Sequence, residues 1–294
     1  MHAASLGESN FVFDETPVTN NTGTMTIGDG AMLPLSGIIN NTGTIELNSA
    51  GSYTLLQLIQ YGVTLEGGGN VTLSDSADNV ISGTLDSVTL TNVDNTISGA
   101  GQLGAGQLEL VNQGTIVATG TNALVIDTGA NTITNSGTLE ATGTGGLVIN
   151  SDVANSGLIW AHGGNVTING AVTGSGSALL DGMASFEFGA ASSANITLDA
   201  AATGTIVLHD SFDFSGAISG FNNDDLLNLA DITFAVGTSA SYIENQDGLS
   251  GTLTVTDGVH TANIAMIGDY SAAGFTLKAD GHSGTLLTYQ DHLI

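Results

Sequence analysis

Apolar and polar residues alternate along this chain in short runs, such as residues 24–27, 71–73 and 166–168. In these runs β-branched or aliphatic side chains alternate with Thr, and this period of two predicts β-strands. Gly, Asn, Asp or Ser bounds each run, and these residues favour turns. The nearest approach to a helical pattern, at residues 55–59, is short. We therefore expect an all-β fold built from short strands.

The strand pattern repeats about every 20 residues. NNTGTMTI at 20–27 recurs as NNTGTIEL at 40–47, and related phrases stand at 111–118, 133–141 and 153–161. A unit of this length with short strands and tight turns predicts one coil of a parallel β-helix, or β-solenoid, whose core forms only when coils stack. The rival all-β fold is a sandwich, which does not require a repeated phrase.

Asparagine occupies the same position in successive units. Stacked turn asparagines can hydrogen-bond from one coil to the next, as they do in cross-β ladders. N-glycosylation is the alternative for the separate N-x-T matches, although such matches are expected by chance in a Thr-rich chain. The repeated asparagines are Asn21, Asn41, Asn112, Asn135 and Asn155.

Composition changes near residue 205. Residues 206–294 hold 11 of the 28 acids, 8 of the 15 aromatic residues and four of the six His. A solenoid also needs its ends covered, because a terminal coil exposes unpaired strand edges. We therefore expect an N-terminal cap at 1–14, solenoid repeats at 15–205, and a β-rich capping or secretion-type module at 206–294.

The charge balance excludes several functions. The 294 residues include 28 acids but a single Lys and no Arg, for a formal net charge of −27. Nucleic-acid binding and attraction to anionic membranes both need basic side chains. No apolar run is long enough for a membrane span, so we expect no membrane insertion. The first ten residues lack the basic and apolar regions of a secretory signal peptide.

The C-terminal region carries a resemblance to a known group of proteins. Its phrases are FDFSGAISGFNNDDLLNLADITF at 212–234 and SGTLTVTDGVHTANIAMIGDYSAAGFTLKADGHSGTLLTY at 250–289. About 80 residues resemble the C-terminal module of giant, low-lysine repeat proteins of proteobacteria, which are adhesin-like or calcium-binding-like and exported by type I secretion. The resemblance implies a secreted or cell-surface protein whose export information lies at its C-terminus. The calcium-binding nonapeptide G-G-x-G-x-D of related toxins does not occur in this chain.

A dense group of oxygen-bearing side chains lies between residues 213 and 231. Calcium takes six to eight oxygen ligands from carboxylates, amides and backbone carbonyls. A polar turn between two strands is the alternative explanation. The predicted calcium ligands are Asp213, Asn222, Asp224, Asp225, Asn228 and Asp231.

Other candidate sites have less support. A glycosidase needs two carboxyl groups flanking a sugar, whereas neighbouring residues such as Asp224 and Asp225 face opposite sides of a strand. His260 and His282 each follow an Asp-Gly turn. They either bind a transition metal as a pair or are simply residues of those turns. For Trp160, the only Trp, one interpretation is a residue in the core or at the rim of a coil. The other is an exposed ring on which a sugar can stack. Paired Thr residues suggest ice binding or simply a solvated strand face; the pairs are Thr24/Thr26, Thr89/Thr91, Thr132/Thr134 and Thr254/Thr256.

Together these features predict an extracellular structural or adhesive β-solenoid segment of a bacterial surface or secreted protein, without catalytic function. The expected partners are a host or neighbouring cell surface, a glycan or matrix. Calcium is the one expected cofactor. The alternatives are a glycan-binding or glycan-hydrolysing β-helix and a filament subunit that self-associates end to end.

Overall fold

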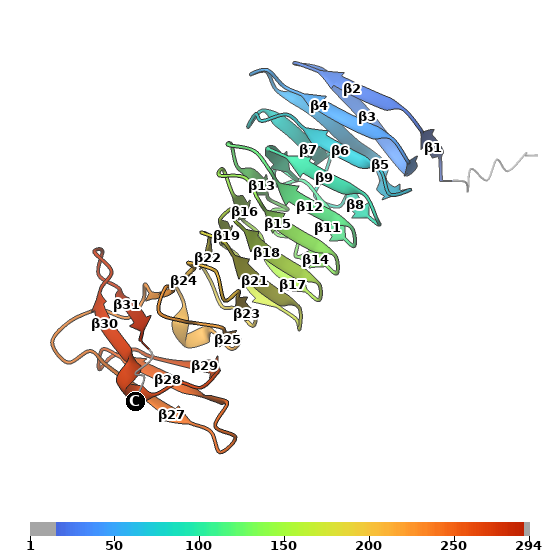
Figure 1. Cartoon of the computed structure of the whole chain (residues 1–294). Helices are drawn as coiled ribbons and strands as arrows, with labels where there is room; N and C mark the ends of the chain where they lie inside the picture. The colour runs from blue at the N-terminus through green and yellow to red at the C-terminus, as the bar shows by residue number, and fades with distance from the viewer. Residues whose placement is uncertain (1–15, 291–294) are drawn as a thin grey trace, which may run out of the picture.

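The computed structural model describes residues 16–290 and confirms the predicted fold class, a parallel β-solenoid with a β-rich end. It has about ten turns of roughly 21 residues each (Figure 1). The predicted N-terminal cap at 1–14 lies outside the described residues. None of the helical segments in residues 16–290 has the length and hydrophobicity that a bilayer span demands.

The strands form two sheets, with two 3₁₀ turns, η1 (Ser211–Asp213) and η2 (Ala272–Gly274), between strands. The larger sheet contains β1 (Val18–Asn21), β3 (Met32–Asn41), β5 (Thr54–Glu66), β7 (Asn79–Gly83), β8 (Thr89–Asn92), β10 (Gly101–Leu103), β11 (Glu109–Asn112), β13 (Leu124–Ile126), β14 (Ile133–Asn135), β16 (Leu147–Ile149), β17 (Val153–Asn155), β19 (Val166–Ile168), β20 (Val172–Thr173), β22 (Ser185–Phe188), β24 (Thr205–Leu208), β26 (Leu226–Leu229), β30 (Phe275–Ala279) and β31 (Thr285–Tyr289). The smaller sheet contains β2 (Thr24–Gly28), β4 (Thr44–Asn48), β6 (Asn70–Leu73), β9 (Thr96–Gly99), β12 (Thr115–Ala118), β15 (Thr138–Ala141), β18 (Leu158–His162), β21 (Ser177–Asp181), β23 (Asn195–Leu198), β25 (Ala217–Ser219), β27 (Ser239–Glu244), β28 (Ser250–Thr256) and β29 (Thr261–Ile267).

A typical coil contributes three strands, one to each of three parallel columns. In one coil β11 pairs with β14, β12 with β15, and β13 with β16. Two of the columns join into the larger sheet because β3 and β5 are long enough to turn the corner between them. The register of this pair shifts between Leu35 and Gly37, where the corner lies.

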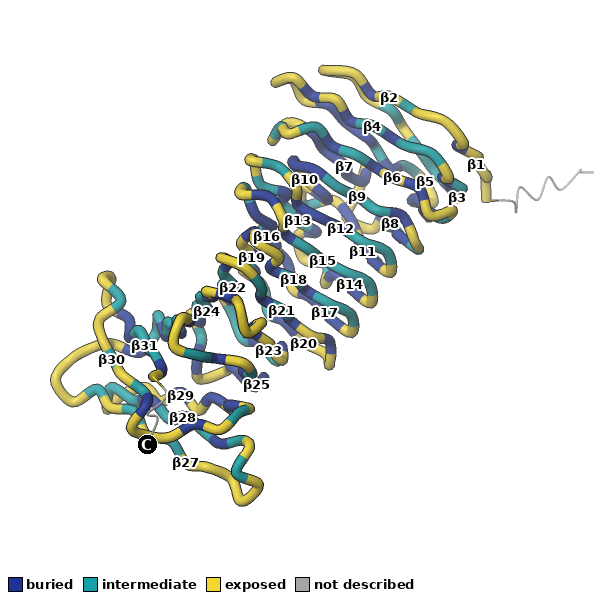
Figure 2. The backbone as a smooth tube through the Cα atoms, in the orientation of Figure 1, coloured by how far each residue is buried: buried dark blue, intermediate teal, exposed yellow. Residues whose placement is uncertain are grey.

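The core is a set of aliphatic ladders that run along the stack. Ile45, Val71, Ile97, Ile116, Leu139 and Ile159 occupy successive rungs of one ladder, and all are fully buried. Most outward positions on these strands are Thr, Ser, Asn or acids, as the alternation predicted; the exceptions are Val117, Leu158, Trp160 and His162. Figure 2 shows buried backbone within the coils and exposed backbone at their turns. Because each rung is covered by its neighbours, stacking itself supplies the apolar burial that stabilises a coil.

The Gly of the repeated phrase is required by close approach of neighbouring coils. A Cβ on Gly137 would lie 2.0 Å from the carbonyl oxygen of Gly114, one coil earlier. The equivalent Gly23 belongs to the first described coil, and a Cβ there meets nothing within 4 Å. The repeated Gly therefore reflects packing between coils.

The predicted asparagine ladder is present and buried. Asn21 donates to Asn41, Asn112 to Asn135 and Asn135 to Asn155, with Nδ2–Oδ1 distances of 2.8–2.9 Å. The sequence pattern missed two members. Asn92 donates to Asn112 at 2.9 Å, and Asn95 accepts from Asn41 at 2.8 Å.

The C-terminal module continues both sheets of the solenoid. The parallel stack runs past residue 205, where we placed the boundary, through β26, and β25 also pairs in parallel with β29. Antiparallel strands then complete the sheets, because β31 pairs with β26 and β28 with β29. Leu253, Ile264 and Leu287 of this module belong to the same buried cluster as the coils. The compositional change near 205 therefore precedes the end of the coils by about one turn.

Candidate functional site

The predicted calcium ligands fall into two separate environments. In the first, Asn222–Asp225 form a turn after β25 that is tied to the preceding coil. The buried Asp225 carboxylate accepts backbone N–H bonds from Gly204 at 2.8 Å and Asn222 at 2.9 Å. The Asp224 backbone N–H donates to Asn222 Oδ1 at 2.9 Å. Burial raises the pKa of Asp225. These contacts lock the turn and use both oxygens of Asp225.

The second environment lies around η1. Asp231 Oδ2 accepts a 2.8 Å bond from the Ser211 backbone N–H. Burial, followed by the negative charges of Asp213 and Asp231, raises the pKa of Asp210. Three buried oxygens here have no hydrogen-bond partner, namely Asp210 Oδ1, Ser211 Oγ and Asp231 Oδ1. The predicted ligand Asn228 lies on β26, and its side chain hydrogen-bonds Asp280. The structure thus brings Asp213 and Asp231 together with Asp210, which the sequence interpretation omitted.

The six residues therefore do not form one ligand shell. Within residues 16–290, no group of three His, Cys, Asp or Glu side chains is arranged to hold a metal ion. Calcium binding stays a prediction, and among the predicted ligands it applies best to Asp213 and Asp231, which lie beside Asp210.

Trp160 lies on the outer face of β18 in a small polar cluster. Its ring stacks on His162 with centroids 4.1 Å apart and planes 3° apart. His162 Nδ1 lies 2.7 Å from Glu140 Oε1, and the Trp160 indole N–H donates to Asp181 Oδ2 at 3.2 Å. The cluster joins three consecutive coils. His162 covers one face of the Trp160 ring, which makes it a poor sugar platform.

The remaining sequence candidates are held in local turns or on different faces. His260 Nδ1 lies 3.3 Å from Asp257 Oδ2, and the His282 backbone N–H donates to Asp280 Oδ1 at 2.7 Å. Thr24 and Thr26 lie on β2 in the smaller sheet, whereas Thr89 and Thr91 lie on β8 in the larger one. These Thr pairs do not form one flat rank.

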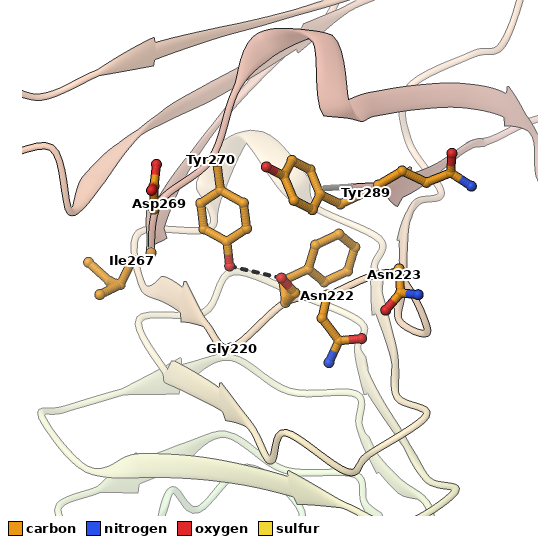
Figure 3. Close-up of a pocket in the computed structure, with 10 residues that line it drawn as sticks. Gly220, Asn222, Asn223, Ile267, Asp269, Tyr270 and Tyr289 are labelled. Atoms are coloured by element: carbon orange, nitrogen blue, oxygen red, sulfur yellow. Dashed lines mark hydrogen bonds between the residues drawn. The ribbon is translucent and has the colours of Figure 1, made fainter. Parts of the chain in front are cut away.

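A pocket of about 680 Å³ lies between the last coil and the C-terminal module (Figure 3). Tyr270 and Tyr289 come from the C-terminal module, and Asn222 and Asn223 come from the turn after β25. Asp269, Gln290, Phe221 and Ile267 complete most of its wall. Pockets of this size accept small organic ligands.

The two tyrosines of the pocket are fixed in place. Their rings meet edge to face with centroids 5.0 Å apart. The Tyr270 hydroxyl donates to the Phe221 carbonyl at 3.0 Å, and the Tyr289 hydroxyl accepts from the Ser271 backbone N–H at 3.2 Å. Burial raises the pKa of Tyr270 to about 12, so its hydroxyl stays neutral.

The pocket carries amides and one carboxylate. Asp269 is the single acid among its described lining residues, and no Lys or His is among them. The described lining residues therefore do not supply the two carboxyl groups that a glycosidase uses. The sequence interpretation missed Tyr270 and Tyr289. The available signal was the concentration of aromatic residues after residue 205.

The fold and pocket define the chain as a parallel β-solenoid closed at one end by an antiparallel module. A comparison with protein families finds no match, and a comparison with curated proteins finds no significant one.

Proposed function

We propose that this chain is an extracellular structural and adhesive segment of a bacterial surface or secreted protein, and that it has no catalytic function. In this proposal the coils are a stiff acidic spacer, and the C-terminal module closes the spacer and contacts the surroundings. The resemblance of residues 212–289 to type I secreted repeat proteins supports export, and the net charge of −27 agrees with a solvated surface protein.

The observation that carries the structural role is the continuity of the stack. Aliphatic ladders run through the coils, the asparagine ladder joins the coils from Asn21 to Asn155, and apolar residues of the C-terminal module join the same core. A repeat array of this kind transmits load through every coil because each contacts only its neighbours. The observation that favours adhesion is the pocket at the closed end of the rod.

Adhesion and catalysis can be separated in one experiment. The whole chain is immobilised on beads and mixed with neutral polysaccharides and with intact bacterial cells, while released reducing ends are measured. We expect retention of glycan or cells without product. Heat-unfolded chain of the same charge is the control for non-specific attraction. Product release that scales with the amount of folded chain would establish a hydrolase and end the proposal.

A filament subunit is the second candidate, and the free edge of β27 favours it. β27 pairs with β28 on one side and has no partner strand on its other side within the described residues. Ile243 on this strand is 70% exposed. An exposed strand edge can template pairing with another chain. Electron microscopy should show end-to-end filaments that Ile243→Lys suppresses; single rods at all concentrations would exclude this candidate.

A further inference from the structure

The pocket between β25 and the C-terminal module is built from two chemically different walls. One wall offers aliphatic surface from Ile267, which is 47% exposed, beside the buried rings of Tyr270 and Tyr289, and the other offers the amides of Asn222 and Asn223. Ligand sites commonly combine an apolar lining with a few placed polar groups. The pocket lies at the closed end of the rod.

The apolar wall is organised before any ligand arrives. Tyr270 and Tyr289 are each at most 7% exposed, and both hydroxyls are engaged with backbone groups. These buried rings therefore form a fixed support beneath the pocket and expose little surface of their own. Fixed side chains reduce the ordering entropy that binding costs.

The polar wall selects against charged anions. The lining contains Asp269 but no cationic side chain, and the only Lys of the chain, Lys278, is not part of it. Amide groups supply both hydrogen-bond donors and acceptors, which suits a ligand whose groups are both. Hydroxyl groups have this dual character, and the C–H groups of a sugar ring match aliphatic surface such as that of Ile267.

We propose that this pocket binds the terminal sugar of a neutral glycan, without cleaving it. Asn222 and Asn223 hydrogen-bond the sugar hydroxyls, and the exposed side chain of Ile267 contacts its C–H groups. The inference rests on the adhesive function proposed above, because it names the ligand class and the site through which adhesion acts. Asp269 accepts a hydroxyl bond as one polar group among several, so its charge is not required.

The test begins with a glycan array that contains neutral, acidic and amine-bearing glycans, probed with the whole chain. The strongest neutral glycan is then titrated by calorimetry against three variants. Asn223 is exposed, so Asn223→Ala keeps the fold and lowers affinity about tenfold through the lost hydrogen bonds. Asp269→Asn removes only charge and changes affinity less than about threefold. Asn169→Ala removes an exposed amide far from the pocket and leaves affinity unchanged.

Each contrary result has a distinct meaning. Glycan binding that Asn223→Ala leaves intact would overturn this site while the adhesive function stands. Binding confined to amine-bearing glycans, with a loss of about tenfold in Asp269→Asn, would replace the neutral sugar with a cationic ligand. Absence of both glycan and cell binding would overturn the site and the adhesive function together.

Discussion

Asn112 and Asn135 are joined across neighbouring coils by a 2.9 Å bond from Nδ2 to Oδ1, and both side chains are fully buried. The Asn112 amide also lies 3.2 Å from the carbonyls of Gly114 and Thr138. One side chain therefore holds its own turn and the next coil. Because these groups are removed from water, their loss leaves buried partners unpaired.

Asn112→Ala is expected to destabilise the chain by about 1–3 kcal/mol for each buried partner left unpaired. Urea unfolding followed by circular dichroism measures the change. Asn169→Ala is the matched control, because Asn169 donates to Asn150 at 2.8 Å between coils but on the exposed surface. Equal effects of the two substitutions would mean that the buried ladder has no special role.

Gly137→Ala is expected to destabilise the fold by about 1–3 kcal/mol, because its methyl group forces neighbouring coils apart. Gly23→Ala makes the same change in the same phrase, where a Cβ meets no atom within 4 Å. We expect its effect to stay within about 0.5 kcal/mol. Thermal melts of both variants test the packing explanation. A large loss in Gly23→Ala would instead assign the Gly to local turn geometry.

Asp75 should make stability depend on acidity between about pH 4 and pH 2. The hydroxyl of Thr121 and the backbone N–H of Asn122 lower its pKa to about 2 in the folded chain. A lowered folded pKa means that the charged form stabilises the fold above the ordinary value of 3.8 and that this contribution disappears as pH falls through about 2. Asp75→Asn should therefore melt below the unsubstituted chain at neutral pH, with the difference shrinking on acidification. A difference that stays constant across this range would show that ionisation of Asp75 does not contribute to stability.

Calcium should act through the carboxylates around η1. The raised pKa of Asp210 means that its charged form destabilises the fold at neutral pH, because burial and the charges of Asp213 and Asp231 oppose it. Calcium offsets this repulsion and is expected to raise the melting temperature. Asp210→Asn should melt higher without calcium and respond to it less. Equal calcium responses in both chains, or none, would remove this site from consideration.

The fold was predictable because the repeated phrase marks one coil. The phrase near residue 92 lacks the marker Gly, since Asn95 stands in its place, and so two ladder members escaped notice. In the structure Asn41 bonds Asn95, 54 positions away, past the coil that contains Gly67–Gly69, and Asn92 bonds Asn112. A sequence repeat predicts the regular rungs but not how a side chain bridges an irregular one.

The sites were less predictable because residues that are close in sequence are not the ones that stacked coils bring together in space. Asp225 reaches Gly204, 21 residues earlier, and Asp231 likewise approaches Asp210. Residues that are one coil apart lie together, as Asp231 and Asp210 do. The turn at Asn222–Asp225 packs on Gly204 instead, so it does not join them. The pocket tyrosines come from the antiparallel module, whose pairing follows no repeat, so periodicity gave no means of placing Tyr270 beside Tyr289.

The most direct test of the account is removal of one coil. Thr138 and Leu158 are register partners on neighbouring coils, so deletion of residues 138–157 joins equivalent positions. We expect this chain to fold with one cooperative thermal transition at a somewhat lower temperature, because every remaining coil keeps its neighbours. Deletion of residues 138–147 removes half a coil and should abolish folding, because later strands then meet the wrong column. Two deletions that fold equally well, or a one-coil deletion that does not fold, would contradict a fold built from interchangeable stacked coils.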